Sequence, residues 1–475
     1  MQPNILFLLP DQLRPDFLGC YGADFLQTSA IDGLAGRGVR YDTVISPSPI
    51  CVPARASMLT GQSAASNGVI DNIAWLRPDK GEMGIRTWPE RLAQGGYHTA
   101  AIGKMHFYPW DISEGFETRI IAEDKRHIHV EDDYHDWLRA RGLRRQHGNE
   151  QRGYQENKGA SLNDLPDAAQ VDRWVANQTA DWLRNYGGDR PFALMVGFPG
   201  PHCPYDPPEA ALARINAQNM PDPLPRTGES VSHRDTFVAS YKRAWADLDY
   251  STLERDEIRR IRHHYAALVE RLDEDVATIL AALELSGQLD NTIVVFASDH
   301  GDYLGDYGLV GKTYFHEPAI RVPLIVTDFR APGAATDTVP RSLLDLFPSF
   351  LEWGGLDPVT QAQGTALSEA PSGRVITGMT THGVMARSAT HKLMRYRNGT
   401  QALFDLVNDP GELDNRISDL ALSEIRDTLE LELARQLIED TIAGHADKKV
   451  PAAQASVPHG FFGRDWRRPY PVIQR

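Results

Sequence analysis

The hydrophobic residues of this chain fall into short runs, each followed closely by polar or charged residues. The runs cover residues 5–9, 99–103, 192–198, 292–297 and 323–326. Continuous apolar runs of this length are typical of strands buried on both faces of a parallel sheet. The pattern predicts a large α/β core whose strands come from widely separated parts of the chain.

Between these runs, apolar positions recur at three- and four-residue steps, which is the helical period. The clearest helix extends from Ser251 to about Leu285, where Ser251 and Glu254 have the spacing of a capping box. A second helix is expected over residues 171–185. We expect such helices to cover the sheet. Two polar, irregular stretches, about residues 123–169 and 212–250, are interpreted as surface insertions that form pocket walls.

The pattern of predicted elements changes near residue 371. Short β-like pieces at residues 375–377, 383–386, 392–396 and 403–406 alternate with turns, and a helix is expected over about 418–442. We therefore predict a catalytic α/β domain over residues 1–370 and a smaller domain, an antiparallel sheet with a helix, over 371–475. The aromatic and basic tail, residues 459–475, is interpreted as a cover for a groove or partner subunit, or as a plain surface tail.

The amino-acid composition limits the kinds of molecule that this protein can bind. The 475 residues carry a net charge of −15, which argues against nucleic acid or an anionic membrane. An anionic substrate must therefore be bound by a local cluster of cations. No apolar run approaches the roughly 18 residues of a membrane span. The start of the chain lacks the features of a secretory signal, so a cytoplasmic location is expected unless a leader has been removed. A homo-oligomer is left open.

Several chemically active side chains directly follow the predicted strands. Asp11 follows the first run, Lys104 and His106 the second, His202 the third, and Asp299 and His300 the fourth. Taken singly, a strand-end aspartate is often a turn or helix cap. Because ligands of open α/β sheets bind at the carboxyl ends of the strands, the aspartates and His300 together predict a divalent-cation site with oxygen ligands and one nitrogen ligand.

A further stretch combines a nucleophile with a fixed charge. Cys51 is followed by Pro53 and, four residues on, by Arg55, in a segment that turns from extended chain into a helix. A cysteine at a helix N-terminus lies where the backbone favours negative charge. The alternative is a small buried hydrophobe, since lone cysteines are usually that. With only Cys20 and Cys203 elsewhere, a disulfide framework is excluded.

The segment 51–61 resembles the modification signature of the type I sulfatases, Cys-x-Pro-x-Arg with a Leu-Thr-Gly ending. In that family the cysteine is oxidised to Cα-formylglycine by a formylglycine-generating enzyme, which the resemblance implies as a maturation partner. Ordered motifs continue the resemblance over about residues 4–330, and more loosely over 403–412. It implies an alkaline-phosphatase-like α/β sandwich, with a large, mostly parallel sheet flanked by helices and a smaller C-terminal antiparallel sheet.

The resemblance also implies a metal site. Asp11, Asp299 and His300 match the ligands of the family, together with the oxygen of modified Cys51. Gln12 occupies the place of a second aspartate, as in the choline-sulfatase and phosphonate monoester hydrolase branches. A neutral amide removes one charge from the site. Ca²⁺, the common metal of the family, is expected first, and His300 keeps Mn²⁺, with Mg²⁺, as an alternative.

The resemblance also implies roles for four residues that contact the substrate or the formylglycine. By resemblance, Lys104 and Lys312 hold the sulfate oxygens, His106 contacts the formylglycine diol and removes a proton from it, and Arg55 holds the same diol. The hydrated, metal-bound aldehyde attacks sulfur, and its collapse then releases sulfate, which a thiolate could not do.

The departing alcohol would take its proton from His202, in a Pro-His segment, or from Lys312. Asn72 is a softer match to a substrate-contacting residue, or only holds a turn. Three histidines of the first insertion, His127, His129 and His135, are not expected to bind the catalytic metal.

Three functions fit this pattern. The first is hydrolysis of a sulfate monoester. The second is hydrolysis of phosphonate monoesters or phosphodiesters by the same centre, which Gln12 favours, whereas Lys104 and His106 favour the sulfatase. The third is a non-catalytic anion-binding protein, against which the full set of cationic and metal-binding residues argues. Choline, carbohydrate and aryl sulfates all remain open as substrates.

Overall fold

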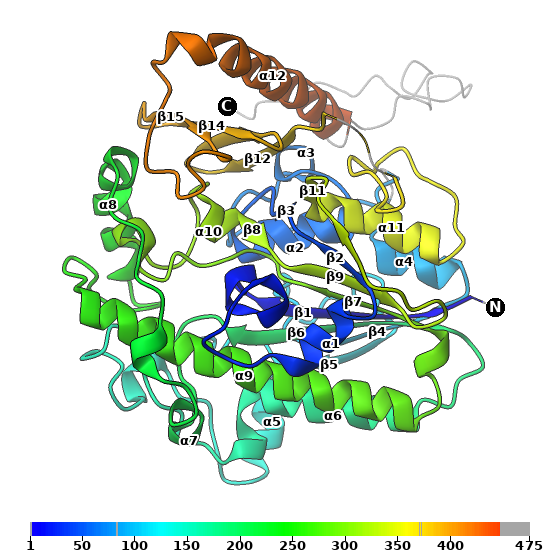
Figure 1. Cartoon of the computed structure of the whole chain (residues 1–475). Helices are drawn as coiled ribbons and strands as arrows, with labels where there is room; N and C mark the ends of the chain where they lie inside the picture. Colours follow the sequence, from blue (N-terminus) through cyan, green and yellow to red (C-terminus); the bar gives the residue numbers. More distant parts are fainter. Residues whose placement is uncertain (1, 82–83, 370, 372, 447–475) are drawn as a thin grey trace, which may run out of the picture.

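Eight strands form the sheet at the centre of the molecule, in the order β10-β2-β9-β7-β1-β6-β4-β5 (Figure 1). The computed structural model describes residues 2–81, 84–369, 371 and 373–446. The strands are β1 (Asn4–Asp11), β2 (Val39–Tyr41), β4 (His98–Gly103), β5 (Thr118–Ile121), β6 (Phe192–Pro201), β7 (Thr292–Ala297), β9 (Leu324–Asp328) and β10 (Ala335–Asp337). All five predicted strands are thereby confirmed.

The sheet is mostly parallel, as the apolar runs predict. In its middle, β1 pairs in parallel with both β6 and β7, so that Ile5 lies beside Ala193 and Ile293. Strand β9 is the exception, because it runs antiparallel to β7 and β2. A separate small sheet joins β3 (Val44–Ile45), β8 (Arg321–Val322) and β11 (Arg341–Ser342). The carboxyl ends of β1, β4, β6 and β7 thus meet at one edge.

Hydrophobic cores lie on both faces of this sheet. Successive side chains of a strand point to opposite faces. Leu6 and Leu8 of β1 belong to one cluster with the long helices, whereas Ile5, Phe7 and Leu9 belong to the other. The two-sided burial explains why the strand reads as a continuous apolar run.

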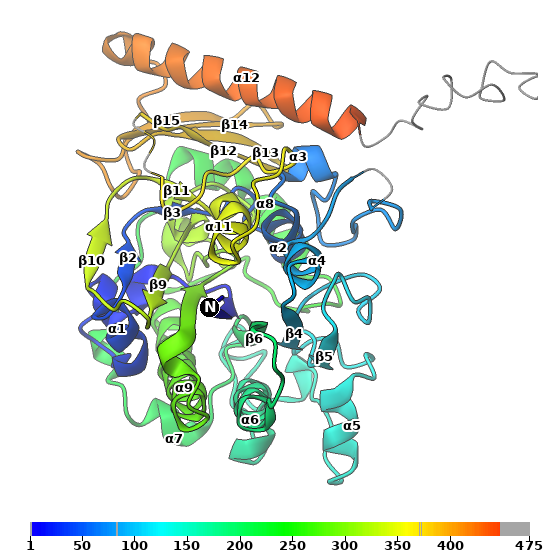
Figure 2. The same cartoon turned by 90° about the vertical axis from the view of Figure 1, so that its right-hand side faces the viewer.

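The helices form a layer on each side of the sheet (Figure 2). One layer holds α1, α6 and α9, and the other α2, α4 and α11. The helices are α1 (Ser29–Ala35), α2 (Cys51–Thr60), α3 (Ala64–Asn67), α4 (Trp88–Gln94), α5 (Asp133–Arg139), α6 (Val171–Asn185), α7 (Glu209–Leu212), α8 (Gly228–Tyr241), α9 (Arg255–Leu285), α10 (Glu317–Ile320), α11 (Leu346–Trp353) and α12 (Ser423–Ala446). None of the described helices has the length and apolarity needed to cross a membrane.

The start of α9 corrects one prediction. Its capping box is formed by Glu254 and Glu257, not by Ser251 and Glu254. Ser251 lies in a bend before the helix, and its backbone N–H donates to Asp249. The second insertion, read as irregular, contains helix α8. Its apolar face is short, which explains why hydrophobic periodicity did not reveal it.

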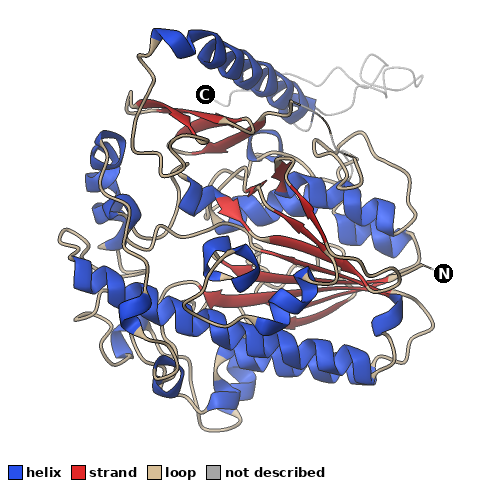
Figure 3. Ribbon diagram, in the orientation of Figure 1, coloured by secondary structure: helices blue, strands red, loops and turns tan. Residues whose placement is uncertain are grey.

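A second, four-stranded antiparallel sheet follows, covered by α12 (Figure 3). It consists of β12 (Ile376–Thr380), β13 (Gly383–Arg387), β14 (His391–Tyr396) and β15 (Gln401–Asp405). Buried ion pairs fasten it to the larger unit, since Lys392 of β14 lies 3.0 Å from Glu317 of α10 and 2.6 Å from Glu412. The predicted tail, 459–475, lies outside the described residues.

A buried histidine on α9 gives the first testable prediction. His264 is 6% exposed, and its Nδ1 lies 3.0 Å from the carbonyl oxygens of Ser161 and Tyr205. Burial lowers its pKa from 6.5 to about 4. The unfolded chain therefore binds the proton first, and stability is lost as the pH falls from the unfolded pKa toward the folded one.

We expect this group alone to remove about 2 kcal/mol of unfolding free energy between pH 7 and pH 5. Urea denaturation at both pH values should therefore show a smaller acid loss for His264→Gln than for the wild type. The neighbouring substitution His263→Gln serves as the control. An unchanged acid loss in His264→Gln would contradict the assignment.

Candidate active site

Cys51 is the first residue of helix α2 and is completely buried. The preceding residue, Ile50, is extended, and the Val52 N–H donates to Asn72 Oδ1 at 3.0 Å. Asn72 therefore satisfies a backbone donor in the first helical turn, and it also lines the cavity described below. The helix predicted near Arg55 begins at Cys51 itself, so the sulfur lies at the positive end of the helix dipole.

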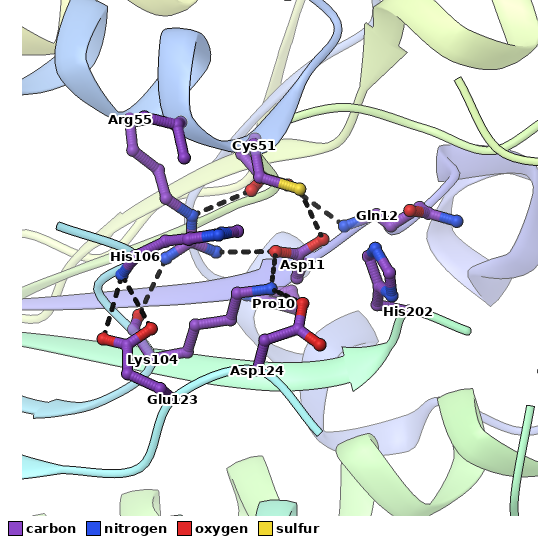
Figure 4. A network of polar contacts seen from close by, with 12 residues as sticks. Pro10, Asp11, Gln12, Cys51, Arg55, Lys104, His106, Glu123, Asp124 and His202 are labelled. Carbon is purple, nitrogen blue, oxygen red and sulfur yellow. Dashed lines mark hydrogen bonds and ion pairs between the residues drawn. The ribbon is translucent and has the colours of Figure 1, made fainter. Parts of the chain in front are cut away.

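Three side chains surround the sulfur. Lys312 Nζ lies 2.9 Å from Cys51 Sγ, and His300 Nε2 lies 3.2 Å from it. Asp11 Oδ1 lies 3.7 Å from the same sulfur (Figure 4). Burial and Asp11 raise the pKa of the Cys51 thiol, but Lys312, His300 and Lys104 lower it more, so the net shift is downward. The surroundings of position 51 therefore favour a negatively charged group.

Arg55 lies behind this cluster, one turn along α2. Its Nε donates to Asp299 Oδ2 at 2.9 Å and its Nη2 to Asp11 Oδ2 at 3.3 Å, and all three side chains are fully buried. Nη1 donates to the Lys104 carbonyl oxygen at 2.7 Å. These contacts hold the two carboxylates, so Arg55 is seen to position the predicted ligands rather than to contact Sγ.

The predicted metal ligands do come together. Ligand atoms of Asp11, Cys51, Asp299 and His300 all lie within 4.8 Å of one another. His300 Nε2 is 3.8 Å from Asp11 Oδ1 and 3.7 Å from Asp299 Oδ1, too far for good hydrogen bonds. Arg55 binds the other oxygen of each carboxylate, so that Asp11 Oδ1 and Asp299 Oδ1 both face His300 Nε2 and could reach a shared cation.

The donor set fits a divalent metal. His300 Nδ1 lies 2.9 Å from the Gly301 carbonyl oxygen, so Nδ1 carries the proton and Nε2 presents its lone pair. Two carboxylate oxygens and one imidazole nitrogen suit Ca²⁺, Mn²⁺ or Mg²⁺ to different degrees. Among the described residues, His127, His129 and His135 lie outside this group.

Gln12 contacts the site from another side. Its Oε1 accepts a hydrogen bond from Lys312 Nζ at 2.7 Å, and its Nε2 donates to Asp302 Oδ2. A left-handed backbone (φ 69°) turns the chain after β1 and lets the Gln12 N–H donate to Asp299 Oδ1 at 3.0 Å. In this arrangement Gln12 orients Lys312, and its role as a metal ligand stays a prediction.

Asp302 is a positioning residue that the sequence did not single out as functional. It is fully buried, and its Oδ1 accepts from the Gly311 N–H at 2.6 Å. Its Oδ2 accepts from Tyr205 OH at 2.6 Å and from Gln12. The carboxylate thereby fixes both the amide that holds Lys312 and the loop that carries it.

Lys104 lies between two acidic side chains. Its ammonium group is fully buried between Asp11 Oδ2, at 2.8 Å, and Asp124 Oδ2, at 2.7 Å. Although burial lowers the pKa of Lys104, the two carboxylates raise it more, so the group stays charged. It does not line the cavity. Lys104 therefore holds Asp11 in place through an ion pair. Its direct contact with a sulfate oxygen stays a prediction.

Close backbone contact fixes the position of Lys104. Gly103, at φ 90°, has no Cβ, and an added one would lie 2.1 Å from the Gly197 carbonyl oxygen. A Cβ on Gly197 would lie 1.9 Å from the Lys104 carbonyl oxygen. Only glycine at both positions allows β4 and β6 to approach this closely.

A group of charged residues after β5 was missed by the sequence analysis. Glu123 accepts the His106 N–H, at 3.1 Å to each oxygen, and Asp124 binds both Lys104 and Arg126. Arg126 Nη2 lies 3.2 Å from His202 Nε2. These residues begin the stretch interpreted as an insertion. They could have been predicted from the short strand β5 just before them, because its carboxyl end lies at the same edge of the sheet as that of β4.

Two buried histidines complete the site. Burial, then Lys104, lowers the pKa of His106 well below 6.5, and burial with Lys312 does the same for His202. His202 Nδ1 lies 2.6 Å from the Cys203 carbonyl oxygen, so its Nε2 is the lone-pair nitrogen. His106 Nδ1 is buried without a partner among the described residues. Both rings are therefore neutral at pH 7.

A cavity of about 540 Å³ opens above these residues. Its floor includes His106, His202 and Lys312. Its walls come from both insertions, as predicted, with Arg126 and His127 from the first and residues 236–245 from the second. The turn between β12 and β13 adds Thr381 and His382. The cavity thus leads from solvent to the cluster around Cys51.

Sequence comparisons identify relatives over most of the chain. A family model described as sulfatase matches residues 3–356, and one described as a protein of unknown function matches 259–473. An arylsulfatase of Clostridium perfringens is 28% identical, over 94% of this chain and 96% of the relative. A choline-sulfatase of Rhizobium meliloti is 30% identical, over 87% of this chain and 82% of the relative.

Structural comparison finds the same architecture in solved proteins. The phosphonate monoester hydrolase of Agrobacterium radiobacter gives a TM-score of 0.78 at 22% identity, covering 93% of this chain and 96% of that one. A protein solved with its substrate, D-glucosamine-2-N,6-O-disulfate, gives 0.73 at 21% identity, covering 95% of this chain and 100% of the other. These likenesses confirm the predicted fold class.

Proposed function

The chain belongs to the sulfatase family of the alkaline phosphatase superfamily, and on that premise we propose that it hydrolyses a sulfate monoester through a formylglycine made from Cys51. The enzyme class, sulfuric ester hydrolase, follows from the family and its named relatives. The formylglycine, the metal and the substrate are the parts that this proposal adds.

One observation carries the proposal. Three chain segments far apart in sequence bring Asp11, Cys51, and the pair Asp299 and Lys312 together beneath one cavity. Buried carboxylates are costly to a fold unless each is paired. A protein that only bound anions would not need two carboxylates and an imidazole facing the same point beside the cysteine.

The side chains divide the chemistry between them. A hydrated aldehyde at position 51 would supply a hydroxyl nucleophile, and a cation held by Asp11, Asp299 and His300 would lower the pKa of that hydroxyl. Lys312, 2.9 Å from Sγ and steadied by Gln12, would bind the ester sulfate beside the nucleophile. His106, neutral and unpartnered at Nδ1, would accept the proton released when the enzyme is regenerated.

Lys312 is also the better source for the proton of the departing alcohol. The sequence offered His202 and Lys312 for this role. In the structure, His202 Nε2 is the lone-pair nitrogen and faces Arg126, so it has no proton to donate. The Lys312 ammonium group donates to Gln12 and points at the reacting position. As the ester O–S bond breaks, its oxygen would take a proton from Lys312.

This role predicts a dependence on the leaving group. In Lys312→Met, we expect kcat for phenyl sulfate to fall by about 10²-fold or more, because a poor leaving group needs the proton. For 4-nitrophenyl sulfate, whose phenolate leaves without help, the fall should be several times smaller. Steady-state rates for a series of substituted phenyl sulfates measure this. An equal loss across the series would assign Lys312 to binding alone.

Modification of Cys51 must precede folding if the enzyme is to mature. The cysteine is completely buried in the first turn of α2. A formylglycine-generating enzyme could not reach the sulfur in the folded chain, so it would act on the unfolded one.

We propose Ca²⁺ as the first metal to test, with Mn²⁺ and Mg²⁺ as alternatives.

The competing function is hydrolysis of phosphonate monoesters by the same centre. The likeness to a phosphonate monoester hydrolase and the presence of Gln12 favour testing it. Side-by-side turnover of phenyl sulfate and a phenyl phosphonate monoester separates the two. We expect the larger kcat/KM for the sulfate. A larger value for the phosphonate would overturn the proposal, and no turnover of either by modified, metal-loaded protein would favour a binding function.

A further inference from the structure

We propose that the substrate carries a second anionic group, a carboxylate or another sulfate, on its alcohol part, and that Arg243 and Arg126 bind this group in the outer half of the cavity. The inference rests on the proposed function, because the ester sulfate is assigned to the floor. It names the class of alcohol that the enzyme releases: a flat, negatively charged one.

The charge of the cavity wall is opposite to that of the protein. The whole chain carries −15, yet the cavity lining has three cationic side chains, Arg126, Arg243 and Lys312, against one carboxylate, Asp71. Asp71 Oδ1 already accepts the Ile73 N–H at 3.1 Å. Once Lys312 is assigned to the ester sulfate, the Arg243 side chain and the Nη1 amino group of Arg126 remain available to a second anionic group.

Arg126 keeps donors available to a ligand. Its Nε and Nη2 bind the two oxygens of Asp124 at 2.9 and 3.0 Å, which fixes the plane of the guanidinium group. Its Nη1 has no hydrogen-bond partner in the described part of the chain. The ring of Trp245 covers the group, with the guanidinium carbon 4.8 Å from the ring centroid. Arg126 is thus a rigid cation at the wall with one free amino group.

Arg243 stands at the mouth of the same cavity. It belongs to the turn that follows α8, two residues before Trp245, and its side chain is exposed. Among the described residues it has no acidic partner, in contrast to its neighbour Lys242, which lies 3.1 Å from Asp249. An unpaired arginine at the entrance attracts anions and can bind a carboxylate or sulfate through two parallel hydrogen bonds.

Aromatic side chains form part of the same cavity lining. Tyr108, Trp245 and Tyr314 all line it. Aromatic walls could also form a cage for a quaternary ammonium group. Here the face of Trp245 is already covered by Arg126, and the only carboxylate of the lining is engaged in its own turn. The walls therefore favour a planar anion over a cationic alcohol.

Matched substrates test this inference. We compare kcat/KM for 3-carboxyphenyl sulfate and the neutral 3-carbamoylphenyl sulfate, in the wild type, in Arg243→Gln and in Lys242→Gln. We expect the wild type to prefer the carboxylate by about tenfold or more, as a charge-assisted contact allows. Arg243→Gln should lose most of this preference through a higher KM, with the neutral substrate unaffected. Lys242→Gln, which removes the same charge one residue away, should keep it.

Two outcomes overturn the inference: no preference for the carboxylate in the wild type, or an equal loss for both substrates in Arg243→Gln. If neither ester is hydrolysed, the proposed function is contradicted. The second anion site is then tested by a binding measurement that needs no turnover. Calorimetric titration with 3-carboxybenzenesulfonate and 3-carbamoylbenzenesulfonate uses the same variants without turnover. Tighter binding of the dianion that depends on Arg243 supports the inference, and equal binding of the two ligands rejects it.

Discussion

Replacing Cys51 by alanine is expected to abolish hydrolysis of phenyl sulfate, with a loss of about 10⁴-fold or more in kcat. The nucleophile is made from this residue and from no other. Lys312 and the start of α2 both direct positive charge at it. Without the nucleophile, the remaining groups can bind the ester but cannot attack sulfur. Initial-rate assays at saturating substrate measure the loss.

Cys203 provides a matched control. It lines the same cavity and is also buried, but burial raises the pKa of its thiol to about 12. Cys203→Ala should keep most of the activity, within about tenfold of the wild type. If Cys203→Ala were inactive and Cys51→Ala active, the nucleophile would have been assigned to the wrong thiol.

Removal of the metal is expected to have the second largest effect. Asp299→Asn removes one of the two carboxylates that face His300, and should lower the bound metal to a small fraction of one ion per chain. Without the cation the nucleophilic hydroxyl keeps a high pKa, so we expect kcat to fall by about 10³-fold or more. Elemental analysis of the purified protein gives the metal content, and titration of chelated enzyme with Ca²⁺, Mn²⁺ and Mg²⁺ identifies the ion.

The variant and the chelated wild type should differ in one respect. Added metal should restore the wild type but not Asp299→Asn. His127→Gln serves as a control, since His127 lines the cavity but lies outside the ligand group. It should retain metal. Full activity of the chelated wild type, with no metal detected, would remove the cation from the account.

The strands were predictable because they are buried on both faces. The alternation of Phe7 and Leu8 between two cores leaves no polar position in residues 5–9 of β1, and such a run has few other interpretations. Helix α8 was not predictable in the same way, because its sequence shows little apolar periodicity. The start of α9 was misplaced because Glu254 can act both as the end of one capping box and as the start of another.

The site residues that lie at the carboxyl ends of strands were predictable from the sequence. Asp11, Asp299 and His300 meet because β1 and β7 are neighbours in the sheet. The partners of Gln12 and Lys104 were not predictable, because each depends on loops whose course the sequence does not specify. Asp124, which pairs with Lys104, begins a stretch without periodicity, and only the three-dimensional structure brings it under Asp11.

Mass spectrometry of the peptide that contains Cys51 tests the central claim most directly. Conversion of the thiol side chain to an aldehyde removes about 18 Da, and active preparations should show this loss in proportion to their specific activity. A fully active preparation in which position 51 is entirely unmodified cysteine would contradict the account.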